Sequence, residues 1–399
     1  MYYPFFTFAS LCTSFCLVLY GQFNKLGGSN RMAGTSQIIA KVPRRSNLEL
    51  YRIVCMLMIV AHHYVVNSGL TWGGPLDDES FSINSIFLAL FGAWGKTGIN
   101  CFLMITGYFM CTSKITLRKF LKLMAQIYLY KLLIYLLFLA SGHESLSVMR
   151  IVKLLMPFWG FQTDFVSCFI AFFLTIPFWT ILVQSMSKRQ HELLLLLLLS
   201  YYTILGSIPS FDVSFNYITW FGIIYMIASY IRLYPAPIFE RKTFWGRLTL
   251  LFVVMAMTSV VLLQKLLGAR YFLVSESNKF FAVVIAITSF LWFKNLNLKY
   301  NRTINALGAG TFGVLLIHAN SNAMRSWLWK ETVDVVGHYA LPIGYLILFS
   351  IGVVLAVFMV CNLIDQLRIA TLEKWFLNWY DNRVAAKADN FINRILEIK

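Results

Sequence analysis

Ten apolar segments, each long enough to cross a membrane as a helix, follow Asn47 in this chain. Lipid offers no partner for backbone N–H and C=O groups, so a segment of this kind has to satisfy them within its own helix. We therefore predict an all-α integral membrane protein built as a bundle of about ten transmembrane helices. The expected limits are 48–66, 84–110, 120–141, 166–185, 191–207, 216–233, 247–267, 278–294, 304–328 and 339–364.

The composition agrees with a membrane protein and excludes a soluble one. Hydrophobic residues make up 59% of the 399 residues and charged residues only 13%. The formal net charge of +17 suggests nucleic acid at first, but the basic residues fall in connections between apolar segments. We predict membrane lipid as a partner and no nucleic acid.

The charge of the connections predicts the orientation of the chain. The connections 67–82 and 207–216 contain no Lys or Arg, whereas basic residues gather in the connections on the other side. Cytoplasmic loops carry an excess of Lys and Arg, so both termini are predicted to be cytoplasmic. An even number of spans agrees with this orientation.

The chain divides into three predicted parts. Residues 1–43 form an N-terminal extension, either a poorly formed secretory signal or a stretch upstream of a true start at Met32. Residues 44–365 form the ten-helix membrane domain, and residues 366–399 a cytoplasmic amphipathic tail suited to the inner leaflet. The seven cysteines show no metal-ligand spacing, so we predict no metal site and no disulfide framework.

The stretch RRSNLELYRIVCMLMIVAHHY, residues 44–64, places polar groups inside the first apolar segment. Arg52 and His63 are eleven residues apart, which returns the helix to within roughly 20° of the same direction. They share a face and lie roughly 16 Å apart along the axis, so Arg52 is expected near the membrane surface and His63 well inside. His62 points roughly 80° away from that line.

Other polar residues at membrane depth are few, and such residues are functional candidates. Segment 84–110 contains Lys96 and Asn100, with Gly95, Gly98 and Gly107 that permit close packing or a break. Lys96 either faces a phosphorylated ligand or extends into a water-filled crevice. His318 lies at nearly the depth of His63, so the two histidines either line one cavity or are satisfied separately by neighbouring helices.

Three motifs together resemble the acyltransferase-3 family of membrane acyltransferases over roughly residues 45–365. They are SNLELYRIVCMLMIVAHHY, GKTGINCFLMITGYFM with the basic stretch KITLRKFLK after it, and TFGVLLIH near the C-terminal end. Arg52 and His63 match the family pattern of an arginine, ten intervening residues and a histidine. The family often carries paired arginines after the second span, where this chain has Arg118, Lys119 and Lys122.

The resemblance implies ten core helices and transfer of an acyl group, commonly acetyl from acetyl-CoA, to a hydroxyl. The acceptor is often a cell-surface polysaccharide or its lipid-linked precursor. A bacterial cytoplasmic membrane is then the expected location, as a multi-pass protein. Acetyl-CoA or another acyl-CoA is expected as a donor substrate, and no cofactor is expected to bind tightly.

The chemistry of acyl transfer fits these residues. A neutral imidazole suits the base that deprotonates the attacking hydroxyl, and a cation suits developing oxyanion charge. We predict His63 as the base, with Arg52 and the region of Lys122 binding the CoA phosphates. A covalent acyl-histidine is an alternative. The predicted substrate-binding residues are Lys96, Asn100, Arg118, Lys119, Lys122 and His318.

A non-enzymatic carrier or flippase of a lipid-linked glycan is the competing hypothesis, with Arg52 and Lys96 gripping a diphosphate. The absence of an acidic residue in the middle of any predicted span disfavours a proton-coupled carrier. A polysaccharide polymerase would have a large outer loop, but the longest outer loops here are about 25 residues. Consumption of acyl-CoA distinguishes a transferase from a flippase.

Overall fold

The computed structural model describes residues 44–385 except 72, 79–81, 114, 157–163, 212 and 269–270. The predicted N-terminal extension and residues 386–399 of the predicted tail lie outside this part. Every regular element within the described part is helical. The elements are α2 (Ser46–Val66), α3 (Pro75–Asp78), α4 (Ile83–Gly92), α5 (Gly95–Met110), α6 (Leu117–Ala140), α7 (Val148–Leu155), α8 (Phe165–Ser185), α9 (Lys188–Leu199), η1 (Ser200–Ile204), η2 (Leu205–Ser207), α10 (Tyr217–Leu233), η3 (Pro237–Glu240), α11 (Lys242–Leu267), α12 (Phe280–Lys294), α13 (Arg302–Ala309), α14 (Thr311–Ala319), α15 (Asn322–Ser326), η4 (Trp327–Thr332), α16 (Ile343–Arg368), η5 (Ile369–Glu373) and α17 (Lys374–Arg383).

Six helical stretches in the described part are long and apolar enough to cross a membrane. Two of the other predicted segments are shorter apolar helices, α10 and α12, and the remaining two, 191–207 and 304–328, are each divided into several short helical elements. The protein is therefore a multi-pass membrane protein, and its described part is all-helical. The six stretches are Ser46–Val66, Ile83–Met110, Leu117–Ala140, Phe165–Ser185, Lys242–Leu266 and Ile343–Arg383.

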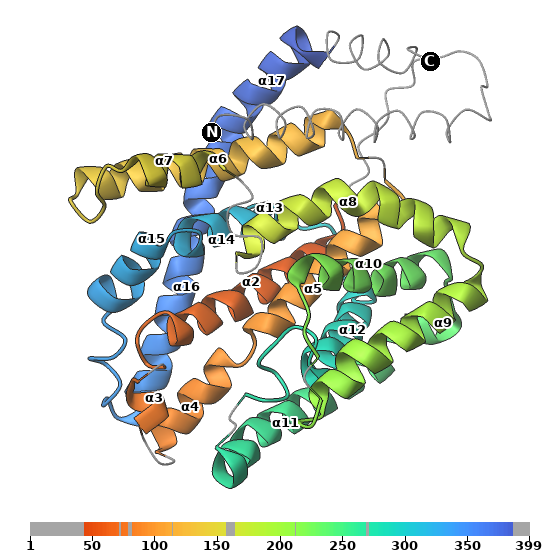
Figure 1. Cartoon of the computed structure of the whole chain (residues 1–399), viewed down its shortest axis with the longest axis horizontal. Helices are drawn as coiled ribbons and strands as arrows, with labels where there is room; N and C mark the ends of the chain where they lie inside the picture. The colour runs from red at the N-terminus through yellow and green to blue at the C-terminus, as the bar shows by residue number, and fades with distance from the viewer. Residues whose placement is uncertain are drawn as a thin grey trace, which may run out of the picture.

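The helices α2 and α5 cross the middle of the molecule (Figure 1). They separate two apolar cores, one shared by α5, α8, α10 and α12 and the other by α2, α6, α14 and α16. Small residues permit this close packing: a methyl group on Gly98 would meet the Cys55 carbonyl oxygen of α2 at 3.0 Å. The same applies to Gly107, which lies against Ala228 of α10.

The periphery of the bundle is apolar as well, as expected of helices that face lipid. Figure 1 shows α11 along one edge of the molecule and α6 and α7 side by side along another. Tyr128 of α6 donates a hydrogen bond to the Leu155 carbonyl at the end of α7, at 2.9 Å. Exposed apolar side chains on α11 and α16 include Leu250, Val254, Leu266, Leu348 and Val360.

The predicted segment 304–328 is not one helix. It breaks at Gly310, between α13 and α14, and again after Ala319. Side chains of α16 accommodate the first break: Asn362 donates to the Leu307 carbonyl at 2.8 Å and Gln366 to the Ala306 carbonyl at 2.6 Å. Carbonyl groups released from the helix therefore keep partners inside the protein.

The boundary predicted at residue 365 lies inside a continuous helix. The helix α16 runs to Arg368, passes through the π-helical turn η5 and continues as α17, which extends beyond the body of the bundle (Figure 1). The segment predicted as a separate tail thus begins as an extension of the last membrane helix.

Candidate active site

A cavity of about 230 Å³ lies among the helix ends that carry the predicted histidines. The lining residues come from the last turn of α2, the first turns of α5, α8 and α10, the end of α14 and α15. We call it the histidine cavity. It is lined by Ile59, His62, His63, Val66, Asn67, Gly95, Lys96, Ile99, Asp164, Phe165, Val166, Tyr217, Leu315, Ala319, Asn320 and Arg325.

His63 and His318 lie in direct contact, with 2.9 Å between His63 Nδ1 and His318 Nε2. His318 Nδ1 lies 2.6 Å from the Val314 carbonyl oxygen, which can only accept. His318 in its neutral form therefore carries its proton on Nδ1, and its Nε2 accepts from His63 Nδ1–H. The Val314 carbonyl oxygen therefore determines the donor and the acceptor in both hydrogen bonds, the one to His318 and the one between the two histidines.

This chain of hydrogen bonds determines which nitrogen of His63 is reactive. With its proton on Nδ1, neutral His63 presents the lone pair of Nε2, which has no hydrogen-bond partner among the described residues. The ring is held through its other nitrogen, as in catalytic sites where a third group orients a base. The ring of His63 is thus held in one orientation at the wall of the cavity.

His62 also lines the cavity but is held differently. Its Nδ1 donates to the Gly92 carbonyl at 2.7 Å, across the break between α4 and α5. Gly95 packs against the His62 ring so closely that a methyl group there would overlap it. His62 therefore packs the end of α2 against the start of α5, and its ring centroid lies 5.8 Å from that of His63.

Two cations line the same cavity. Lys96 Nζ donates to the Tyr217 hydroxyl at 2.5 Å, and Arg325 donates to the side chain of Asn322. Lys96 was predicted from the sequence and Arg325 was not, although a basic residue inside the apolar segment 304–328 was a visible signal. Asp164 was not predicted either, and its carboxylate caps α8 by accepting from the Ser167 backbone N–H and hydroxyl at 3.0 and 2.7 Å.

Asn100 does not line the cavity. Its side chain is completely buried and donates to the Ser277 and Ala282 carbonyls at 2.7 and 3.2 Å. Its carbonyl oxygen accepts from Trp220 Nε1 at 2.9 Å. The structure gives Asn100 a role in joining α5 to α10 and α12 in place of the predicted contact with substrate.

Arg52 lies away from the cavity, near the other end of α2. Its guanidinium is 3.4 Å from the Glu49 carboxylate, which also pairs with Arg44 at 3.4 Å. Its side chain keeps 27% of its surface exposed. The structure therefore brings His63 together with Lys96 and His318, and leaves Arg52 at a separate position.

Two of the predicted donor-binding cations are ion-paired with the C-terminal helices. Arg118 forms a bidentate salt bridge with Asp381 of α17, with both hydrogen bonds at 2.8 Å, and Lys122 pairs with Glu373 at 2.5 Å. Lys119 lies beside them in the first turn of α6. These pairs could not be predicted from the sequence, because the two carboxylates follow the cations by some 250 residues.

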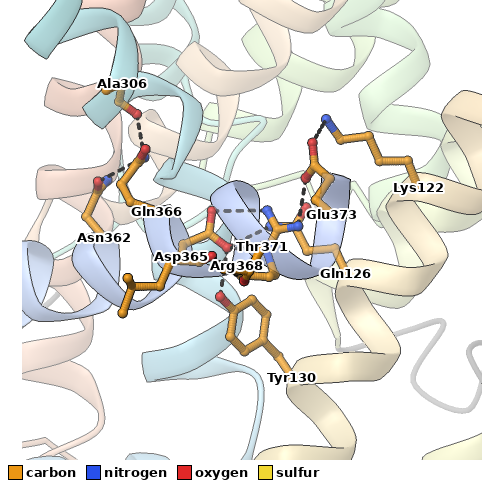
Figure 2. A network of polar contacts seen from close by, with 11 residues as sticks. Lys122, Gln126, Tyr130, Ala306, Asn362, Asp365, Gln366, Arg368, Thr371 and Glu373 are labelled. Carbon is orange, nitrogen blue, oxygen red and sulfur yellow. Dashed lines mark hydrogen bonds and ion pairs between the residues drawn. The ribbon is translucent and has the colours of Figure 1, made fainter. Parts of the chain in front are cut away.

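Glu373 belongs to a larger set of paired charges, which we call the tail network (Figure 2). Asp365 is completely buried and accepts from Tyr130 at 2.8 Å and from Arg368 at 2.6 Å. Arg368 also pairs with Glu373 at 2.7 Å. The network consists of Lys122, Gln126, Tyr130, Asp365, Arg368 and Glu373.

A family model described as an acyltransferase domain matches residues 45–361. The chain belongs to the acyltransferase-3 family. Searches of curated proteins and of solved structures found no match. The match covers both histidines of the cavity, Arg52 and the first turns of α6.

Membership in the acyltransferase-3 family makes this protein a membrane acyltransferase. The alternative of a non-enzymatic carrier is therefore set aside. The tail network is only partly within the matched region, since Asp365, Arg368 and Glu373 lie after residue 361, and all of α17 follows that residue. The pairing of α6 with the C-terminal helices is thus a property read from this chain's own structure.

Proposed function

We propose that this acyltransferase moves an acyl group, acetyl in the simplest case, from acyl-CoA to a hydroxyl of a cell-surface glycan or its lipid-linked precursor. The observation that carries the proposal is the hydrogen-bond chain from Val314 through His318 to His63, which leaves Nε2 of His63 free at the cavity. A base oriented in this way is what deprotonation of a hydroxyl requires.

The transfer proceeds by proton movement at a single nitrogen. The acceptor oxygen attacks the thioester carbonyl carbon while His63 Nε2 takes the hydroxyl proton. The carbon–sulfur bond then breaks, and the CoA thiolate leaves with the proton that His63 returns. The oxyanion that forms at the carbonyl oxygen lies in the positive field of the cavity wall, to which Lys96 and Arg325 both contribute.

An acyl-histidine on His63 is a second route within the same function. His63 Nε2 would first attack the thioester carbon, and the carbon–sulfur bond would break with CoA leaving as its thiolate. The acceptor hydroxyl would then attack the acyl carbon and break its bond to Nε2, and the released hydroxyl proton would balance the thiolate charge. Both routes use the same nitrogen, and rapid-quench detection of labelled protein separates them.

The proposed topology has ten membrane helices with both termini in the cytoplasm, at the bacterial cell membrane. In this arrangement the histidine cavity lies toward the outer face, because the connections 67–82 and 207–216 adjoin the helix ends that line it. Arg52 and the start of α6 then lie toward the cytoplasm. Acyl-CoA would enter from that side, with Arg52 and the basic first turn of α6 receiving its phosphates.

The proposal is tested with the full chain in nanodiscs and radiolabelled acetyl-CoA. We expect wild type to bind and consume the donor, His63→Ala to bind it without turnover, and Arg52→Ala to bind it more weakly. The loss in turnover for His63→Ala should be about 10²- to 10⁴-fold. His143→Ala, which changes an exposed histidine, is the matched control. Near-normal turnover by His63→Ala, or no turnover by wild type with any acyl-CoA, contradicts the proposal.

A further inference from the structure

The histidine cavity is rich in hydrogen-bond donors and poor in acceptors. Besides Lys96 and Arg325, it is lined by Asn67 and Asn320, whose side-chain nitrogens are buried without a hydrogen-bond partner among the described residues. Buried polar groups in proteins nearly always have partners, so donors left open at a cavity point to a ligand that supplies acceptors.

The two cations have no carboxylate of their own. Among the described residues, neither Lys96 nor Arg325 lies within 4.0 Å of an Asp or Glu oxygen. Asp164 is the acidic residue of the lining; its charge acts on Arg325 from beyond ion-pair distance, and one of its carboxylate oxygens caps α8. An unpaired cation at membrane depth is costly, so a ligand with negative charge is the partner that fits.

A second cavity of about 190 Å³ extends this chemistry. It shares Asn320 with the histidine cavity, and Lys131, Arg150 and Lys153 line it together with Glu144. Glu144 pairs with Arg150. The two linings together hold five basic residues and two acidic ones, Asp164 and Glu144. The excess of positive charge thus continues from the histidines along α6 and α7.

We infer that the acceptor is an acidic glycan, with carboxylate or phosphate groups held by Lys96 and Arg325 while a neighbouring hydroxyl lies at His63. Further acidic sugars of the same glycan bind in the second cavity, where basic residues outnumber acidic ones. This inference rests on the proposed function, because only a transferase has an acceptor. Its assignment to the acceptor follows from the side on which the cavity lies, since the donor phosphates belong at the opposite end of α2.

Binding is measured by equilibrium dialysis on the full chain in nanodiscs of neutral lipid, without acyl-CoA. The probes are a tetrasaccharide with alternating glucuronate and its carboxyl-reduced form, and maltotriose phosphate with maltotriose. We expect wild type to bind at least one acidic probe about tenfold more tightly than its neutral counterpart. Lys96→Gln and Arg325→Gln should each remove most of that preference. The matched controls are Lys242→Gln and Arg247→Gln, exposed cations in the first turns of α11.

Two results overturn the inference. One is an equal affinity of wild type for acidic and neutral probes, or a preference that survives in both variants. The other is a charge preference for the donor: wild type would turn over succinyl-CoA faster than acetyl-CoA, and Lys96→Gln and Arg325→Gln would lose that preference. Absence of turnover with an intact preference for acidic probes would instead reject the proposed function and leave the binding site standing.

Discussion

The histidine cavity and the tail network are both rich in cations, but the cations have different partners in the two regions. In the tail network, Lys122 and Arg368 each pair with a carboxylate at 2.5 to 2.7 Å, and the pair of Arg368 with Asp365 is buried, while Lys122 is 42% exposed. In the cavity, Lys96 and Arg325 have only neutral hydrogen-bond partners.

This difference separates cations that hold the fold from cations available to a ligand. A buried ion pair with its hydrogen bonds complete cannot release a charge without leaving the other one exposed to an apolar surrounding. Cations with neutral partners keep their charge available. We therefore expect changes in the tail network to lower stability, and changes in the cavity to lower activity.

The largest expected effect on stability is that of Asp365→Asn. The substitution keeps the shape of the side chain but removes the charge that faces Arg368 and accepts from Tyr130. We expect a loss of about 3 kcal/mol in the free energy of unfolding, measured by denaturation in detergent micelles. Turnover per folded molecule should stay unchanged. Asp77→Asn, on an exposed carboxylate, is the control. Reduced turnover with normal stability would break the comparison.

A smaller effect, confined to activity, is expected for His318→Ala. Without His318, the Nδ1 proton of His63 loses the acceptor that orients the ring. We expect kcat to fall roughly 10- to 100-fold while KM for acetyl-CoA stays the same. His318→Gln should recover part of the loss, since its amide oxygen can accept the same proton. Equal rates for the two variants would show that His318 only fills space.

The smallest effect is expected for Asp381→Asn, which tests whether the predicted donor site overlaps the C-terminal helices. Arg118 and Asp381 are about half exposed, at 46% and 45%, so their pair should contribute less than about 1 kcal/mol to stability. If Arg118 also binds CoA phosphates, releasing it should tighten acetyl-CoA binding about twofold. Calorimetry measures this affinity, and Arg118→Gln should change it in the opposite direction. No change in either variant would remove Arg118 from the donor site.

The sequence predicted much of what lies within single helices. The apolar segments marked the long helices, and Gly95, Gly98 and Gly107 were predicted to permit close packing or a break; the break lies at Gly95, where α5 begins. The matched depth of His63 and His318 allowed either a shared cavity or separate partners, and the structure places the two rings in contact. These features follow from helical period and rise, which depend only on positions along one chain segment.

Other features depend on which helix faces meet, and the sequence does not contain that information in a local form. Asn100 was predicted to bind substrate, and the structure shows its side chain hydrogen-bonded to Ser277 and to Trp220 of α10. Arg118 and Lys122 looked free until α17 and η5 brought carboxylates to them.

By itself, therefore, the sequence determined an all-helical membrane bundle, its polar residues at membrane depth and the family to which it belongs. Only the tertiary structure decided which cations are paired, that His318 orients His63, and that Arg325 joins Lys96 at the same cavity. The physical reason is that a charge inside a membrane protein acquires its role from its partner, and partners come from helices far apart in the chain.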